Sequence, residues 1–206
     1  GDTYGDGWAL NTGLTLTVDL GEMELDILEL PSGTNGVPTY ASIAFSTFFP
    51  FQIEYTEWKV YQGNDDVASD WNTVSFNDAT WSSVKAADIG TTSAITTYIR
   101  KSFTLNSISD YPVLNVRVKY AGGVAAYLNG NLVARFNLAD GFDSNTESIA
   151  VHDATAFSKF HVILATAGIQ EGSNVFSFEI HRPLGGSSAD PVVFDATGVF
   201  GVEDCS

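Results

Sequence analysis

Apolar residues alternate with polar ones at every second position in many short runs of this chain. Two such runs lie on either side of Gly21, the first over 14–20 and the second over 23–27. A period of two is typical of strands with one buried face, because successive side chains point to opposite sides of a sheet. The pair of runs therefore predicts a hairpin whose polar face is acidic.

The same alternation recurs further along the chain. We expect strands at 43–45, 99–105, 114–120, 125–128, 132–136, 160–164, 175–181 and 192–195. Asn129-Gly130 separates two of these runs, and an Asn-Gly pair in that position favours a tight hairpin because both residues accept a positive φ. Strong helical patterns are absent, and at most a turn or two of helix is expected over 153–158 or 165–168. Many short strands with turns between them predict an all-β fold, an antiparallel β-sandwich of the jelly-roll kind.

Charge restricts the partners of this chain. Its 206 residues include 25 acids and 9 bases, which give a formal net charge of −16. A field of that sign repels nucleic acid and anionic membrane surfaces. No run of 18 apolar residues occurs, so we expect no membrane insertion.

The acidic residues are unevenly distributed. Residues 1–70 contain twelve acids and a single base, Lys59, whereas residues 71–206 contain thirteen acids and eight bases. This shift, together with Pro50, predicts a boundary between a small N-terminal β lobe, residues 1–54, and a jelly-roll domain, residues 55–206.

Several segments after residue 55 occur in the order seen in a known family. They are Asp70-Trp71, Phe76–Trp81, Thr97–Phe103, Val124–Gly130 with Val133–Arg135, Glu171–Val175, Glu179–His181 and Ser187–Asp190. Residues 55–202 therefore resemble a galactose-binding-domain-like jelly-roll accessory module of secreted and surface microbial proteins. The resemblance implies an extracellular or cell-surface location, beside hydrolases or phosphoesterases. One difference is that Tyr120–Gly123 lacks the acids that the family usually has before this hairpin. Separately, Tyr4–Trp8 is similar to the YGDGW opening of small secreted β modules.

The sequence gives no sign of catalysis. His152, His161 and His181 are scattered without metal-ligand spacing, and the single cysteine, Cys205, lies next to the chain end. The acids of 22–26 alternate along one strand face, which is typical of a solvated surface, whereas a glycosidase pair must flank one bond in a cleft. We therefore expect a protein without enzymatic activity and without a cofactor.

Calcium is the one metal that the sequence suggests. Asp2 and Asp6 lie in one glycine-rich loop, and Asp65 and Asp66 lie in another, near Asp70. Carboxylates in loops are the hard oxygen ligands that Ca²⁺ takes. No EF-hand pattern occurs, and the expected role is a structural one.

Self-assembly is the main functional interpretation. The run over 14–20 carries four large apolar residues, more than a lobe of about fifty residues shelters easily, so it needs a partner sheet in the same chain or in the next molecule. Pairing with a neighbour by strand addition would give an extracellular filament of identical subunits. The residues expected at this contact are Trp8, Leu14, Leu16, Val18 and Leu20.

Carbohydrate binding is the alternative interpretation. The jelly roll would then be an accessory module of a larger secreted hydrolase or adhesin, with a sugar held by loops at 61–71, 140–145 and 185–190. The residues expected to contact the sugar are Tyr61, Trp71, Asp140, Asp143 and Asp190. Trp71 and Trp81 also fall on framework positions of the family, which favours core packing for both.

Overall fold

A computed structural model divides the chain into two compact units, Gly1–Ser46 and Thr47–Ser206. It describes residues 15–18, 23–26, 56–63, 67–108, 113–164 and 166–201. The division lies close to the boundary that we expected after residue 54, and that boundary itself stays a prediction.

The first unit contains a two-stranded antiparallel sheet. Its strands are β1 (Thr15–Val18) and β2 (Met23–Asp26). The register pairs Leu16 with Leu25 and Val18 with Met23, so apolar positions lie opposite apolar positions. The hairpin predicted around Gly21 is confirmed, since β1 pairs with β2 of the same chain. The short apolar run at 43–45 lies outside the described residues.

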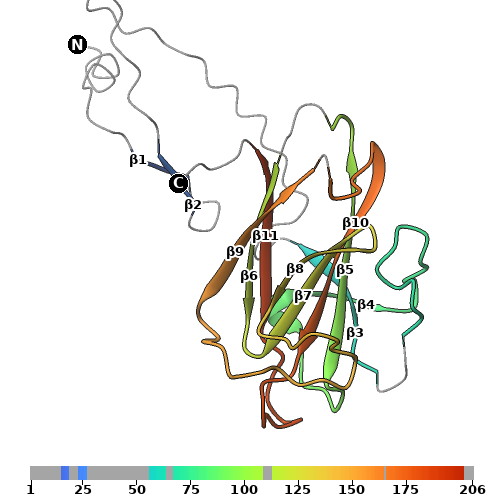
Figure 1. The fold of residues 1–206 in the computed structure, drawn as a ribbon, viewed down its shortest axis with the longest axis vertical. Coiled ribbons are helices and arrows are strands. Elements are labelled where there is room, and N and C mark those ends of the chain that lie inside the picture. Colours follow the sequence, from blue (N-terminus) through green and yellow to red (C-terminus); the bar gives the residue numbers. More distant parts are fainter. Residues whose placement is uncertain are drawn as a thin grey trace, which may run out of the picture. The chain divides into compact units, whose positions relative to one another are not determined.

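The second unit is an antiparallel β-sandwich, which confirms the predicted fold class. Its elements are β3 (Glu57–Tyr61), β4 (Ser82–Lys85), the 3₁₀ turn η1 (Ala86–Asp88), β5 (Thr96–Leu105), β6 (Val113–Tyr120), β7 (Gly123–Leu128), β8 (Asn131–Phe136), β9 (Phe157–Ile163), β10 (Gly172–His181) and β11 (Phe194–Gly201). One sheet has the order β4-β3-β5-β10-β7-β8 and the other β11-β6-β9. Figure 1 shows the long strands of both sheets running along one common direction.

The core lies between the two sheets. Phe176, Phe178 and Ile180 of β10 face Phe194 and Phe200 of β11, and Trp58 packs edge-on against Phe178 and Phe194 at centroid distances of 5.9 and 5.1 Å. In β6 the core residues Leu114, Val116, Val118 and Tyr120 occupy every second position, as the alternation predicted. Burying side chains of this size contributes about 1.5–3 kcal/mol each, so this seam stabilises the sandwich most.

The hairpin between β7 and β8 forms as predicted. Asn129 and Gly130 connect the strands with φ of 49° and 88°, the positive values that a two-residue hairpin turn needs. The Asn129 side chain also fixes its surroundings, since its Nδ2 donates to the carbonyl oxygen of Gly168 and its Oδ1 accepts from the backbone N–H of Val175. The turn is thus joined to the start of β10.

Other boundaries differ from expectation. The last strand was expected at 192–195, but β11 begins at Phe194 and continues to Gly201, because Ala196 and Gly198 pair with Val118 and Val116 of β6. Ala and Gly at core positions weaken the apolar alternation, so the sequence did not indicate the part of β11 that follows residue 195. The strands β3 and β4 were not predicted either. Among the described residues, the only helical turn is η1, at neither of the expected places.

A buried arginine holds the long β3–β4 loop, residues 62–81, on the outer face of the six-stranded sheet. The Nε of Arg100, which is 2% exposed, donates to Asp78 at 2.9 Å, and its Nη1 donates to the carbonyl oxygens of Trp71 and Thr73. Its guanidinium also lies 5.0 Å from the ring centre of Phe76. This single side chain therefore organises the segment that resembles the family's DW…FNDATW motif.

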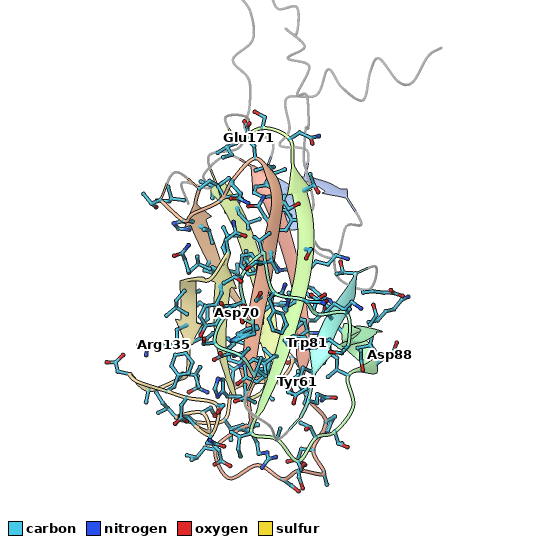
Figure 2. The ribbon with its side chains drawn as sticks, turned by 90° about the vertical axis from the view of Figure 1, so that its right-hand side faces the viewer. Tyr61, Asp70, Trp81, Asp88, Arg135 and Glu171 are labelled. Atoms are coloured by element: carbon cyan, nitrogen blue, oxygen red, sulfur yellow. The ribbon has the colours of Figure 1, made fainter. Side chains whose placement is uncertain are left out.

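An aromatic cluster fills the space under that loop. Trp71 packs against Trp81, Tyr98 and Tyr127, and Tyr61 stacks on Trp81 at a centroid distance of 5.6 Å. Figure 2 shows Tyr61 and Trp81 close together on this face, with Glu171 at the opposite end of the sandwich. Trp71 and Trp81 are buried, as expected for framework residues.

Asp78→Asn tests the anchoring role of Arg100. Replacing the carboxylate leaves a buried guanidinium without its counter-ion, so we expect the free energy of unfolding to fall by about 3 kcal/mol. Chemical denaturation followed by tryptophan fluorescence measures this loss. The matched control is Asp140→Asn, since Asp140 pairs with Arg135 at the exposed surface and its loss should leave stability unchanged. Equal effects of the two variants would contradict the anchor.

Candidate functional site

The loops of the second unit gather at one end of the sandwich. β5, β7 and β11 begin there, and β6 and β10 end there, so the connections of 86–95, 121–122 and 182–193 meet. The β8–β9 loop, residues 137–156, joins them, since the N–H of Ser148 donates to the carbonyl oxygen of Arg182 at 3.0 Å. We call this region the loop end.

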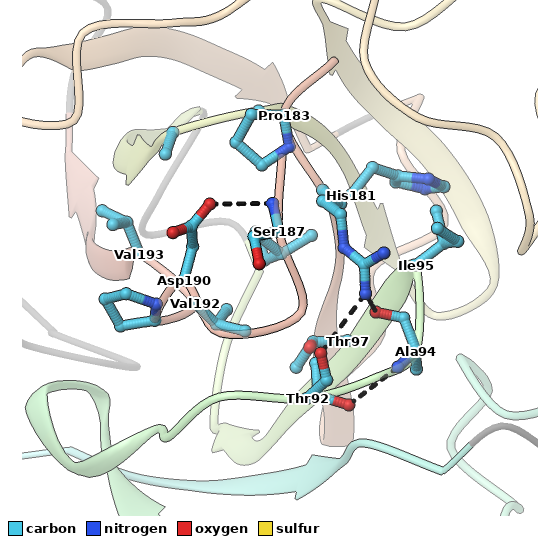
Figure 3. A pocket seen from close by; sticks show the side chains of 15 residues that line it. Thr92, Ala94, Ile95, Thr97, His181, Pro183, Ser187, Asp190, Val192 and Val193 are labelled. Atoms are coloured by element: carbon cyan, nitrogen blue, oxygen red, sulfur yellow. Dashed lines mark hydrogen bonds between the residues drawn. The ribbon is translucent and has the colours of Figure 1, made fainter. Parts of the chain in front are cut away.

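A small hollow opens at the loop end between the two sheets. Its volume is about 30 Å³, and its polar lining comes from Thr92, Thr97, Arg182, Ser187 and Asp190. A volume of this size holds one or two water-sized groups. Figure 3 shows Thr92, Thr97, Ser187 and Asp190 around the hollow, with the ring of His181 pointing away from it. Apolar walls come from Ile95, Ile180, Pro191, Val192 and Val193.

Thr97 lines this hollow, and its buried hydroxyl has no partner among the described residues. Thr97 is 1% exposed, and its Oγ1 has no hydrogen-bond partner in the part of the chain that the structure describes. Buried hydroxyls are usually paired, because leaving one unsatisfied costs about 1–3 kcal/mol. Ser177 and Thr197 also have buried hydroxyls without a described partner, and of these three residues Thr97 is the one that lines the hollow.

The rim of the hollow carries a negative carboxylate, that of Asp190, and a positive guanidinium, that of Arg182. The Oδ2 of Asp190 accepts from the backbone N–H of Ser187 at 2.8 Å, and the Oγ of Ser187 accepts from the N–H of Ala189. The Nη2 of Arg182 donates to the carbonyl oxygens of Ser93 and Ala94 at 2.8 and 2.9 Å, which fixes the guanidinium beside the start of β5. Figure 3 marks the contact between Asp190 and Ser187 with a dashed line.

Gly122 is a required glycine in this wall. A Cβ at this position would lie 2.1 Å from the carbonyl oxygen of His181 and 2.6 Å from the nitrogen of Pro183. The β6–β7 turn can therefore approach the end of β10 only because the residue has no side chain. The sequence difference noted at Tyr120–Gly123 thus has a structural consequence, since small residues let the turn close against the hollow.

The predicted sugar contacts fall in different places. Asp190 lies at the hollow, and Asp143 caps the β8–β9 loop, where the Thr146 hydroxyl and the Asn145 N–H lower the pKa of its carboxyl group. Asp140 pairs with Arg135, and Tyr61 and Trp71 lie in the aromatic cluster on the outer face of the six-stranded sheet. Trp71 is 5% exposed and thus presents no free ring face at the surface. The five residues do not form one site.

The predicted contact and metal residues lie mostly outside the described part. Leu16 and Val18 belong to β1, whereas Trp8, Leu14 and Leu20 lie outside the described residues. The acids of the calcium prediction, Asp2, Asp6, Asp65 and Asp66, also lie outside them. Among the described residues, no group of three His, Cys, Asp or Glu side chains is placed to hold a metal ion. Self-assembly and calcium binding stay predictions.

The residues that sequence reasoning missed are Thr97, Arg182 and Ser187. Thr97 belongs to a strand pattern and gives no signal of its own, since its unpaired state depends on what surrounds it. Ser187 was recognised only as part of a loop.

In the described residues no helix is long and apolar enough to cross a membrane.

Comparisons with known proteins give only partial likenesses. No family model and no curated protein matches the chain. Among solved structures, it is similar to the Bacteroides uniformis beta-glucuronidase (14% identity, TM-score 0.47, 74% of this chain and 18% of that one). A glycosyl hydrolase family 2 member from Bacteroides cellulosilyticus matches with 12% identity and a TM-score of 0.46 over 75% and 20% of the two chains. An uncultured Clostridium beta-glucuronidase matches with 10% identity and a TM-score of 0.44 over 79% and 30%. The chain thus spans less than a third of each of these proteins.

Thr97→Val tests whether the hydroxyl is unsatisfied. Valine has nearly the same shape without the polar atom, so we expect the free energy of unfolding to stay constant or rise by up to about 1 kcal/mol. The neighbouring Thr96→Val is the matched control. The Thr96 hydroxyl donates to the carbonyl oxygen of Ser144 at 2.8 Å, and its loss should destabilise by about 1–2 kcal/mol. Thermal and urea unfolding measure both, and a destabilised Thr97→Val would show that its hydroxyl is already paired.

Proposed function

We propose that this β-sandwich is a non-catalytic carbohydrate-binding module whose loop-end hollow receives a hydroxyl group of a neutral sugar. The observation that carries the proposal is the buried, unpartnered Thr97 hydroxyl at the hollow. A hydroxyl both donates and accepts, which is the complement that a sugar hydroxyl requires. Ligand sites in proteins commonly combine a few such polar groups with apolar walls.

The rim supplies the further contacts that a sugar ring needs. Asp190 uses one carboxylate oxygen for the Ser187 N–H, and its other oxygen is available to accept from a sugar hydroxyl. The Ser187 hydroxyl accepts from Ala189 and keeps its own hydrogen for donation. Pro183 and Pro191 border the hollow and offer apolar surface to the C–H face of a ring. Together these groups give one acceptor, one donor and a packing surface.

Size and charge restrict the ligand. A hollow of about 30 Å³ admits a hydroxyl or hydroxymethyl group, while the remaining sugar ring lies across the opening. The formal net charge of −16 repels sulfated or uronate-rich polymers at a distance. A neutral glycan, bound by an exposed end or side branch, satisfies both restrictions.

The proposal includes no catalytic step. Among the described residues that line the hollow, Asp190 is the one carboxylate, whereas glycoside hydrolysis uses two carboxyl groups on either side of the bond that breaks. The sequence resemblance of residues 55–202 to secreted accessory modules supports a role outside the cell, beside the catalytic or adhesive part of a larger protein. The module would hold that part close to its glycan.

Titration calorimetry with neutral oligosaccharides tests this function. The full chain should bind at least one of a panel of galactan, mannan, xylan and glucan oligosaccharides. Thr97→Val and Asp190→Asn should each weaken that binding roughly three- to tenfold, the value of one or two lost hydrogen bonds.

Thr197→Val is the matched control for this experiment. Thr197 is also buried and also lacks a described hydrogen-bond partner, but it lies on β11, away from the hollow. Its variant should bind sugars as the native chain does. Absence of binding to every neutral glycan, or equal binding by Thr97→Val and the native chain, would refute the proposed site.

A further inference from the structure

His181 lies buried between the six-stranded sheet and the β8–β9 loop. It is 1% exposed, and its Nδ1 lies 2.7 Å from the carbonyl oxygen of Thr146 and 3.2 Å from the hydroxyl oxygen of Thr96. A carbonyl oxygen only accepts, so Nδ1 must carry a hydrogen. Thr96 in turn donates to the carbonyl oxygen of Ser144, and the Phe142 ring meets the imidazole edge-on at 5.4 Å. Two strand side chains thus hold this loop from below.

The other ring nitrogen of His181 faces an acid. Its Nε2 lies 3.3 Å from Oε2 of Glu179, whose side chain is 12% exposed. Burial, followed by the nearby Glu179 carboxylate and its hydrogen bond, raises the pKa of Tyr127, so the phenol stays protonated and donates to Glu179. The pair is therefore surrounded by protein and shielded from water.

The two protonation states of Nε2 in His181 differ in the hydrogen bonds that the ring can make. When Nε2 carries a hydrogen, the imidazolium donates to both Thr146 and Glu179, so both ring nitrogens have a hydrogen-bond acceptor. When Nε2 loses it, a nitrogen lone pair faces a carboxylate oxygen at 3.3 Å with no hydrogen between them. Repulsion in a buried place then favours movement of the ring or of the loop above it.

The remaining charges near His181 come from other elements. Asp143 of the β8–β9 loop is close enough for the His181 charge to contribute to the lowering of its pKa. Arg135 of β8 reaches Phe142, with its guanidinium 5.9 Å from the ring centre, and binds Asp140. From β5, the phenol of Tyr98 lies opposite Glu179 in the register. The carboxylates nearest to the imidazole are thus those of Glu179 and Asp143.

The held loop supports the rim of the hollow. The N–H groups of Leu184 and Gly185 donate to Ser148 Oγ at 3.1 Å and to Glu147 Oε2 at 3.0 Å. These contacts fix the start of the β10–β11 loop, residues 182–193, which carries Ser187 and Asp190. A continuous set of hydrogen bonds therefore runs from His181 through 144–148 to the rim.

We propose that His181 is a positioning residue whose proton, shared with Glu179, fixes the β8–β9 loop and so sets the sugar affinity of the loop-end hollow. This inference rests on the proposed function, because it assigns the regulation of the same site. The hydrogen bond from Nε2 to Glu179 exists only while Nε2 carries a hydrogen, so this contact is present at low pH and is lost when that hydrogen is removed on raising the pH. Binding should be tight in acid and weaken towards alkaline pH.

Sugar binding as a function of pH, with variants of the pair, tests the coupling. For a neutral oligosaccharide that the native chain binds, we expect the Kd to rise roughly three- to tenfold between pH 5.5 and pH 8.5. Glu179→Gln replaces the carboxylate by an amide that donates to neutral Nε2, so its Kd should stay near the acidic native value throughout. His181→Asn keeps a donor near Nδ1 but cannot titrate, and its profile should also be flat.

His152→Asn is the matched control. His152 lies in the same loop, and its Nδ1 is 2.9 Å from the carbonyl oxygen of Tyr120, but it stacks on the Tyr120 ring and Nε2 meets no described carboxylate. This variant should keep the native pH profile. A native Kd that does not change with pH, or a Glu179→Gln profile like the native one, would overturn the inference.

A measurement without sugar separates this inference from the proposed function. ¹⁵N spectra of the full chain should show Nδ1 of His181 protonated throughout, and the amides of 144–148 and 183–190 should shift together with the titration of its Nε2. If these amides respond but no glycan binds, the coupling holds and the proposed function fails. If a glycan binds but the amides do not respond to His181, the coupling fails and the function holds.

Discussion

Both faces of the central strand β10 are covered, and this one condition shapes the second unit. Phe176, Phe178 and Ile180 face the core, while Ser177, Glu179 and His181 point to the other side and are also buried. Buried polar groups usually need partners. His181 and Glu179 lie 3.3 Å apart on β10 itself, and further partners for this face of the sheet come from the neighbouring strands and from two long loops, whereas the Ser177 hydroxyl has no described partner.

The two loops solve this problem differently. The β3–β4 loop brings a carboxylate and backbone carbonyls to Arg100 and closes over it with tryptophans, so it forms a rigid aromatic cover. The β8–β9 loop brings backbone carbonyls to Thr96 and His181, so its attachment rests on the Thr96 hydroxyl and on the hydrogen at Nδ1 of His181. Because of this difference, we expect the β3–β4 loop to contribute to the stability of the sandwich, and we propose that the β8–β9 loop influences binding at the loop end.

Most of the fold could be predicted from the sequence, whereas the hollow at the loop end could not. Alternation in β5, β6 and β10 and the Asn129-Gly130 turn predicted strands and a hairpin that the structure contains. Asp190 was the one expected sugar contact that lies at the hollow. Trp71 was expected as a sugar contact under the alternative interpretation, although its framework position favoured packing, and its burial under the β3–β4 loop shows packing. A sequence pattern cannot distinguish a sugar-stacking ring from a packed one, because an aromatic ring is suited to both surroundings.

The amino-acid sequence was enough to predict an acidic antiparallel β-sandwich, because composition sets the charge and residues close together along the chain set the strand periodicity and the turns. The folded arrangement was needed to learn which polar atoms are unpaired, such as the Thr97 hydroxyl, and which are paired, such as the hydroxyl of its neighbour Thr96. The reason is that adjacent strand residues face opposite sides of the sheet, where segments distant in sequence supply or withhold the partner.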